Sequence, residues 1–329
     1  MNGRMSEVDQ APVDAWIRPV LADLQARLGV NSDPVAEWVR DPSQLGRAGK
    51  RHRSQRWWAE AIGKREIQLL QERAVTPRDR ARIYEQMTSL GTAFMSVIPS
   101  DALRQTFPSD FYRLLLKWWL GMELTEETGA LVSCPGCGEG VDRFGDHLLC
   151  CPRNNYTRRH QSVQGALGDI LTQARHPWSR EEGWTERGVT VKPADLLVRM
   201  WTRTQHMAID GTVKHGWQKR HQTGQAEPPG REKWRSFLVD AEVRKHEKYD
   251  AVCRRADWLF RAMAFGCWGG MGPEAAVTLH QLIERAAGWV GIRERAAERG
   301  RMRAAVGLAL MRSVGSYLEA KSALFALPL

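Results

Sequence analysis

Apolar residues recur three or four positions apart in several stretches of the chain, which is the spacing of one face of an α-helix. In the stretch 157–174, for example, Val163, Leu167 and Ile170 fall on one face. Thr76 and Pro77 together form a helix-start signal, an N-cap residue followed by proline at the first helical position. The pattern predicts helices over 12–29, 51–74, 77–90, 111–120, 157–174 and 235–261, with further helices after Pro273. We attribute these apolar faces to packing between helices.

Between residues 184 and 213 the pattern changes to short apolar runs that are typical of β-strands. We expect strands over 184–191, 194–200 and 206–213, and a short apolar run follows the helix at 235–261. The resulting order of helix, three strands, helix and strand indicates a unit that combines a sheet with helices, of α/β or α+β class.

The composition is that of a globular protein. The chain has 329 residues, of which 43% are hydrophobic and 26% are charged, and this argues against a wholly disordered chain. No window approaches about 18 unbroken apolar residues, so we expect no membrane-spanning helix.

The positive charge is unevenly distributed along the chain. The formal net charge is +10, and residues 152–255 hold 20 Lys and Arg against 12 Asp and Glu, a net of +8. Solvated surface charge with no partner is one explanation. Other features of the same segment favour the second explanation, contact with a nucleic acid.

Four cysteines and a histidine lie close together around residue 140. Cys134 and Cys137 form a CxxC turn, and His147 and Cys151 follow with the spacing of a structural zinc site. Cys150 is an alternative fourth ligand, and a run of reduced thiols without metal is an alternative to the site itself. Since this segment has few apolar side chains, bound zinc could supply the folding energy that it lacks.

Two aspartates fall opposite each other if the strands at 194–200 and 206–213 form an antiparallel hairpin that turns at Thr202 and Arg203. In a regular ladder of this register Asp195 pairs with Asp210, and their Cβ atoms lie about 5 Å apart on one face. Two carboxylates so close would repel each other unless a cation lies between them, and Mg²⁺ prefers such oxygen ligands.

The helix that follows carries a group of polar residues on one face. Glu242, Lys245 and Tyr249 share this face, with Lys248 beside them. A lysine here could stabilise the charge that develops on a phosphate during hydrolysis. The alternative is an exposed, ion-paired helix surface.

Taken together, these motifs resemble the C-terminal region of non-LTR retrotransposon proteins, in which a Cys/His zinc knuckle and a restriction-like endonuclease follow a reverse transcriptase. The resemblance covers about residues 85–290, and its motifs stand in the order CPGC (134–137), GDHLLCCP (145–152), RRH (158–160), PAD (193–195), AIDGTV (208–213) and EVRKHEKY (242–249). No segment resembles a reverse transcriptase, so we expect the chain to represent a fragment or a remnant of such an element.

The resemblance implies a PD-(D/E)XK nuclease fold, with Asp195 and Asp210 as ligands of a catalytic Mg²⁺. Thr212 stands where the family usually has lysine, so the lysine is expected to be Lys245 or Lys248 on the next helix, beside Tyr249, with Lys214 as a rival. Glu182 or Glu186 could match an acid before the first strand. The remaining assignments are nucleic-acid or packing contacts from Arg158, Arg159 and His160, and structural Zn²⁺ at Cys134, Cys137, His147 and Cys151.

The sequence thus predicts a restriction-endonuclease-like core preceded by a zinc knuckle and flanked by helical regions. The predicted segments are an N-terminal helical segment (1–50), a helical region (51–130), the knuckle (131–156), the endonuclease domain (157–270) and a C-terminal helical region (271–329). We expect an intracellular, nuclear, metal-dependent endonuclease that acts on DNA, with RNA as a further partner and no small-molecule cofactor. The alternatives are an inactive nucleic-acid-binding remnant and a zinc-stabilised structural protein, and the oligomeric state stays open.

Overall fold

The computed structural model describes residue 63 and residues 66–102, 105–124, 133–153, 157–181, 184–186, 189–192, 194–217 and 236–321. The chain divides into two compact units, Met1–Ala74 and Val75–Leu329. The expected helix at 12–29 and most of the one at 51–74 lie outside the described residues, although residues 66–73 are helical.

The second unit is a mixed α+β structure built on a four-stranded sheet. The strands lie in the order β1 (Trp178–Arg180), β4 (Leu196–Val198), β5 (His206–Lys214) and β6 (Trp258–Gly266). Strand β4 is antiparallel to β1 and β5, whereas β6 is parallel to β5. The main sheet therefore follows the predicted order of helix, three strands, helix and strand, although its first strand lies elsewhere than predicted.

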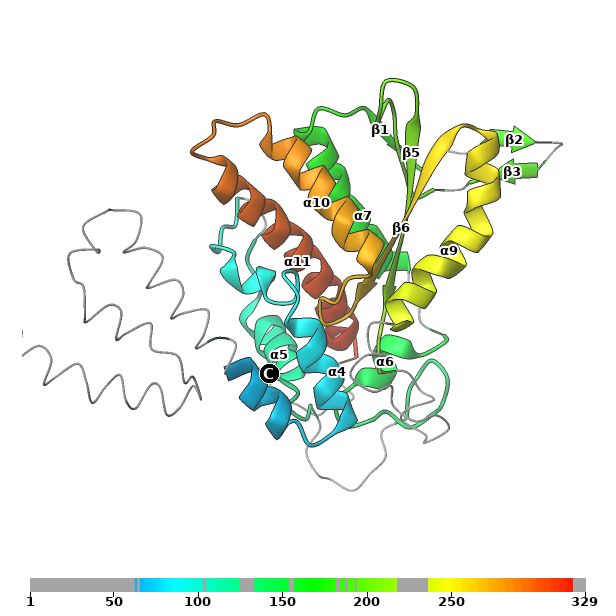
Figure 1. Ribbon diagram of the computed structural model, residues 1–329. Helices are drawn as coiled ribbons and strands as arrows, with labels where there is room; N and C mark the ends of the chain where they lie inside the picture. The colour runs from blue at the N-terminus through cyan, green and yellow to red at the C-terminus, as the bar shows by residue number, and fades with distance from the viewer. Residues whose placement is uncertain are drawn as a thin grey trace, which may run out of the picture. The chain divides into compact units, whose positions relative to one another are not determined.

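Helices cover both faces of this sheet (Figure 1). Helix α7 (Thr157–Gln173) packs on one face, with α10 (Pro273–Ala287) and α11 (Arg295–Glu319) on the same side, and α9 (Ser236–Arg255) packs on the other. This arrangement follows from the alternation of side chains along a strand. Met207, Ile209 and Val213 of β5 are buried in the core that includes α7, while Ala208 is buried in the core below α9.

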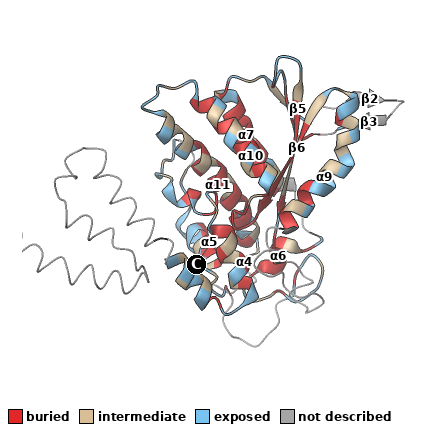
Figure 2. Cartoon of the chain, viewed as in Figure 1, coloured by how far each residue is buried: buried red, intermediate tan, exposed pale blue. Residues whose placement is uncertain are grey.

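The burial map follows these layers (Figure 2). Buried residues line the inner faces of α7, α10 and α11, and exposed residues follow the outer face of α9. The predicted apolar face of α7 is confirmed, since Val163, Leu167 and Ile170 are all at most 3% exposed.

The predicted single strand over 184–191 is wrong. These residues form a separate two-stranded hairpin of β2 (Trp184–Glu186) and β3 (Val189–Val191), and the first strand of the main sheet is β1 instead. Strand β1 has only three residues, and two of them are polar, so no alternating pattern marks it in the sequence. Its pairing with β4 determines its conformation.

The helix predicted over 235–261 is too long, because α9 ends at Arg255 and β6 begins at Trp258. Asp257 between them adopts a left-handed backbone conformation with φ of 55°. Strand β6 then pairs with β5 along nine residues. These tertiary hydrogen bonds override the helical pattern of the local sequence.

The remaining helices begin and end close to their predicted residues. Helix α4 (Pro77–Gln86) is capped by the Thr76 side chain, which accepts a hydrogen bond from the Asp79 amide at 3.0 Å. Helix α5 (Ser109–Leu120) ends at Gly121, whose φ of 80° suits glycine. The 3₁₀ turn η2 (Ala93–Ser96) lies between them, and α6 (Asp146–Cys150) belongs to the cysteine-rich segment. Among the described helices, none has the length and apolar character needed to cross a membrane.

Candidate functional site

The two aspartates predicted to pair do meet at one end of the sheet. The ladder between β4 and β5 pairs Leu196 with Ile209, in the register that the hairpin arithmetic assumes, and ends there. The amide of Asp195 donates to the carbonyl of Ile209 at 3.0 Å, whereas a regular ladder would join it to Asp210, so the register shifts by one residue at the site. The two carboxyl groups nevertheless interact, because Asp195 contributes to the raised pKa of Asp210. The predicted convergence of the two acids is therefore observed, but their regular cross-strand pairing is not.

The electrostatic environment shifts the pKa values of the two carboxyl groups in opposite directions. Burial and the neighbouring charge of Asp195 raise the pKa of Asp210 from 3.8 to about 6, against the lowering effect of Lys245. The pKa of Asp195 is lowered instead: burial raises it, but hydrogen bonds from His160 and from the Gly211 amide outweigh burial. In this pair Asp195 is thus the group that ionises first, and Asp210 retains a proton more readily.

A lysine from the opposite helix contacts the acid pair. Lys245 of α9 forms an ion pair with Oδ2 of Asp210. Lys248 lies one turn further, where its ammonium group is 4.7 Å from the ring centroid of Tyr249. Tyr249 itself packs against Phe260, with ring centroids 5.6 Å apart. Of the two lysines left open by the sequence, the geometry favours Lys245.

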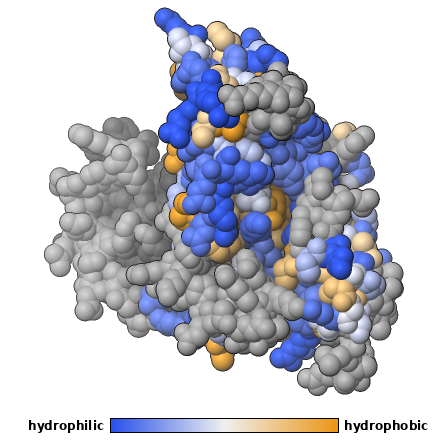
Figure 3. All heavy atoms as spheres, turned by 90° about the vertical axis from the view of Figure 1, so that its right-hand side faces the viewer, coloured by the Kyte–Doolittle hydropathy of each residue, from blue (hydrophilic) through white to orange (hydrophobic). Residues whose placement is uncertain are grey.

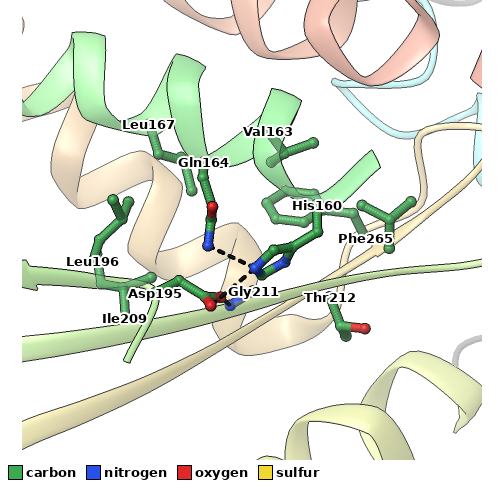
Figure 4. A pocket seen from close by; sticks show the side chains of 11 residues that line it. His160, Val163, Gln164, Leu167, Asp195, Leu196, Ile209, Gly211, Thr212 and Phe265 are labelled. Carbon is green, nitrogen blue, oxygen red and sulfur yellow. Dashed lines mark hydrogen bonds and ion pairs between the residues drawn. The ribbon is translucent and has the colours of Figure 1, made fainter. Parts of the chain in front are cut away.

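A histidine from α7 contacts the pair from the other side (Figure 4). Nε2 of His160 lies 2.9 Å from Oδ1 of Asp195, and Gln164 lies 2.6 Å from the same ring nitrogen. Oδ2 of Asp195 accepts a hydrogen bond from the Gly211 amide at 2.6 Å. Together these residues line a small pocket between α7 and the sheet.

The three residues of the RRH motif have different environments. The backbone of Arg158 lies in α7, but its side chain is outside the described part of the structure. Arg159 is 1% exposed, and its guanidinium group donates to the carbonyl of Leu149 at 2.8 Å and contacts Sγ of Cys267 at 3.1 Å. A nucleic-acid contact by Arg159 is therefore not supported, and the packing alternative accounts for it. His160 is the member of the motif that reaches the acid pair.

Glu242 of α9 does not join the acid pair, although it shares the predicted helix face with Lys245. Its carboxylate accepts hydrogen bonds from the amides of Glu274 and Ala275 at 3.2 and 2.9 Å, and so caps the first turn of α10. Of the two other predicted acids, Glu182 is outside the described residues, and for Glu186 only the backbone is described.

Exposed cations lie on the elements that carry Asp210 and Lys245. They are Lys214 at the end of β5 and Arg244 and Lys248 on α9. Burial and the charges of Arg244 and Lys245 lower the pKa of Lys214, so Lys214 lies near these two cations. Tyr249 and, to a smaller extent, the charge of Asp210 raise the pKa of Lys248. The surface on the α9 side of the unit is largely hydrophilic (Figure 3).

The predicted metal ligands form a compact cluster. One donor atom from each of Cys134, Cys137, His147 and Cys151 lies within 4.8 Å of the other three, and this set includes Cys151 rather than Cys150. Sγ of Cys134 and Sγ of Cys151 are 3.8 Å apart, and Sγ of Cys137 is 3.2 Å from Nε2 of His147. Tetrahedral zinc with Zn–S bonds of about 2.3 Å needs ligand separations of about 3.5–3.8 Å. The cluster could bind a metal ion and is compatible with zinc.

Local hydrogen bonds lower the pKa of one ligand of this cluster and fix the position of another. Burial raises the pKa of the Cys134 thiol, but amides of the CxxC turn and the neighbouring ligands lower it to about 6, which favours a thiolate. The carboxylate of Asp142 accepts from the amides of Phe144, Asp146 and His147 at 3.0, 3.1 and 2.6 Å. It thereby caps α6 and fixes the helix that carries His147.

A buried polar network connects this cluster to the sheet. Asp146 is fully buried next to His147, forms an ion pair with Arg78 of α4, and accepts from Nε1 of Trp118 at 3.1 Å. Nε2 of His215, directly after β5, lies 3.3 Å from the same carboxylate. Burial raises the pKa of Asp146, but Arg78 and His215 outweigh it and bring the pKa to about 2. Sequence reasoning missed this network, because its members are distant in the sequence.

The known proteins add no family assignment to this geometry. Neither a protein-family model nor a curated protein matches the sequence.

Proposed function

We propose that this chain is a metal-dependent DNA endonuclease in which Asp195 and Asp210 hold the catalytic cation and Lys245 assists. The single observation that carries this proposal is the convergence of two carboxylates, from β5 and from the residue before β4, with a lysine from the facing helix. A largely buried acid pair whose members differ in pKa, beside a pocket and between the two inner strands of a sheet, is typical of a catalytic site.

The order of the elements supports the same proposal. Three antiparallel strands, a helix and a parallel fourth strand follow α7, and this is the order expected for a restriction-like PD-(D/E)XK core. The acids lie directly before β4 and within β5, and the lysine lies on α9, between β5 and β6 in the chain. Fold order alone establishes no function, so the proposal depends on the site.

The donor set fits a hard divalent cation. Asp195 and Asp210 provide carboxylate oxygens, which Mg²⁺ prefers over nitrogen or sulfur ligands. The ammonium group of Lys245 already lies beside Asp210, which indicates that this position attracts positive charge. A cation bound between the acids would also offset the repulsion that raises the pKa of Asp210. When bound, Mg²⁺ would lower the pKa of a coordinated water.

The residues of the chain then have distinct tasks in phosphodiester hydrolysis. A water oxygen attacks phosphorus, a new P–O bond forms, and the bond to the leaving oxygen breaks. Lys245 faces this position and would stabilise the negative charge that grows on the phosphate oxygens. Lys214, Arg244 and Lys248 would attract and orient the nucleic-acid backbone.

The exposed cations supply the observation that favours the second candidate function, a nucleic-acid-binding remnant without hydrolysis. They would bind a phosphate backbone whether or not the acid pair is active. The zinc cluster is compatible with either function. Its buried ligands His147 and Cys151 and its link to the core favour a structural part in both.

A nicking assay separates these candidates. Zinc-loaded protein is incubated with supercoiled plasmid and Mg²⁺, and we expect nicking that stops with EDTA and falls at least about a hundredfold in Asp195→Ala, because several kcal/mol of charge stabilisation are lost. Asp240→Ala, which removes an exposed acid of α9, is the matched control and should retain activity.

Each of the other outcomes of this assay would point to a different function for the chain. DNA binding without nicking would contradict the endonuclease and leave the binding remnant. Equal nicking by Asp195→Ala would mean that the activity arises elsewhere. No affinity for DNA at low salt would leave the zinc-stabilised structural protein.

A further inference from the structure

Both oxygens of Asp195 have a fixed hydrogen-bond donor. Oδ1 faces Nε2 of His160 at 2.9 Å, and Oδ2 accepts from the Gly211 amide at 2.6 Å. A carboxylate has about four lone-pair sites, so two remain for a cation or a water. The rotation of this side chain is therefore set by α7 and β5 before any ligand arrives.

The imidazole lies between Asp195 and the side chain of Gln164. His160 lies in the first turns of α7, and the amide of Gln164, one turn later, lies 2.6 Å from its Nε2 (Figure 4). Because Nε2 donates its single proton to Asp195, it does not also accept from this amide, and Gln164 limits the ring by close packing. Gly211 leaves the space around this contact open. A Cβ at Gly211 would lie 3.7 Å from Oδ2 of Asp195 and 3.8 Å from Nδ1 of His160, so any longer side chain would crowd both groups.

This arrangement has a consequence besides stability. The side chains of His160 and Asp195 are 24% and 16% exposed, so the contact is partly buried and fixes the direction of the carboxylate as well as contributing to the fold. The contact lies at the candidate metal site, where the direction of the carboxylate matters most. Groups that orient a metal ligand from behind commonly change metal affinity by about 10- to 100-fold.

We infer that His160 is a positioning residue whose Nε2 orients Asp195 for divalent-cation binding. This inference deepens the proposed function and rests on it for the identity of the metal site. It concerns the binding of the cation, so it can be tested without any nuclease activity.

The test measures Mn²⁺ binding to the zinc-loaded full chain by the loss of the free-ion electron paramagnetic resonance signal. Mn²⁺ takes the same oxygen ligands as Mg²⁺. His160→Phe keeps a ring but removes the donor, and His160→Gln restores an N–H near the position of Nε2. His280→Phe on α10 is the matched control, because that side chain is 61% exposed.

We expect His160→Phe to weaken Mn²⁺ binding at least about tenfold and His160→Gln to recover it to within about threefold of the unmodified protein. The unfolding temperature of both variants should stay within about 4 °C, and His280→Phe should bind normally. If His160→Phe fails to fold, His160→Leu provides the second variant, because it also lacks the donor, and the same loss of affinity is expected.

Unchanged Mn²⁺ affinity in His160→Phe, or in His160→Leu if His160→Phe does not fold, would overturn the inference while leaving the proposed metal site intact. An equal loss in His160→Gln would also overturn it, since the hydrogen bond would then not be the cause. If the unmodified protein binds no Mn²⁺, the metal site of the proposed function fails and the inference fails with it.

Discussion

At the scale of single residues, Asp210 carries an unfavourable charge in the absence of a cation. Its carboxyl group is 7% exposed, and burial and Asp195 raise its pKa to about 6. Because the folded pKa lies above the unfolded value of 3.8, folding favours the protonated form. The corresponding stability is present below about pH 4 and is lost as the pH rises through about 6.

Asp210→Asn should therefore stabilise the metal-free protein at pH 8. The expected gain in the free energy of unfolding is on the order of 2 kcal/mol, and it should disappear near pH 4. Urea unfolding at the two pH values measures the difference, with Asp240→Asn as the exposed control. A loss of stability at pH 8 would contradict the idea that the acid pair is repulsive.

Single-residue variants also decide which lysine, Lys245 or Lys248, assists the proposed hydrolysis. Lys245 contacts Asp210, whereas Lys248 lies over the ring of Tyr249. If the chain hydrolyses DNA, Lys245→Ala should lower the nicking rate about a hundredfold, whereas Lys248→Ala should change it less than about threefold. Single-turnover nicking at saturating protein measures this step without the contribution of binding. The reverse order of effects would assign the role to Lys248.

At the scale of elements, the cysteine-rich segment is joined to the rest of the unit by its interior. Leu148 and Leu149 of α6 belong to the main core, and Asp146 connects α4, α5 and the end of β5. The segment is thus part of the same cooperative structure as the sheet. Loss of the metal should therefore lower the stability of the whole unit and not only of the segment that carries the four ligands.

Cys137→Ser should release the zinc and destabilise the whole second unit. We expect a loss of at least about 3 kcal/mol, or roughly 6–12 °C in unfolding temperature for a unit of this size. Metal analysis gives the zinc content and calorimetry gives the transition. Cys150→Ser is the matched control, since Cys150 is not in the ligand cluster. One zinc per chain retained in Cys137→Ser would contradict the assigned ligand set.

Asp146→Asn tests the link between this segment and β5. Removing the charge leaves Arg78 buried without its counterion, which costs about 3–5 kcal/mol in such sites. Asp110→Asn, at an exposed ion pair of α5, should cost less than about 1 kcal/mol. Chemical unfolding of the zinc-loaded variants compares the two. Equal losses would mean that the buried network does not support the unit.

Local patterns predicted the elements whose register and spacing are set within a short stretch. The hairpin between β4 and β5 turns within a few residues, so its register from Leu196 to Val198 follows from simple counting, whereas the shift by one residue at Asp195 does not. The zinc ligands span 18 residues, so their spacing could be recognised in the sequence in the same way. Strand β1 has no pattern of its own, and the buried ion pair joins residues 68 positions apart, so only the tertiary structure reveals them.

At the scale of the whole molecule, the position of the charge matters more than its total. The +10 of the chain comes mainly from residues 152–255, and Lys214, Arg244 and Lys248 of this segment are exposed on β5 and α9, the elements that carry Asp210 and Lys245. An electrostatic binding surface should be visible as a salt-dependent affinity for nucleic acid. Cations elsewhere on the unit should contribute little to it.

The triple variant Lys214→Gln/Arg244→Gln/Lys248→Gln therefore gives the sharpest test of this surface. Removing one cation that pairs with a phosphate should reduce the slope of log affinity against log salt by about 0.9, so the triple variant should reduce it by up to about 2.7. The control Arg80→Gln/Arg113→Gln/Arg293→Gln changes the net charge equally at exposed positions of other segments. Fluorescence anisotropy with a duplex between 50 and 200 mM salt measures both slopes. Because the two variants have the same net charge, equal slopes would mean that overall charge, and not a surface around the acid pair, attracts the nucleic acid.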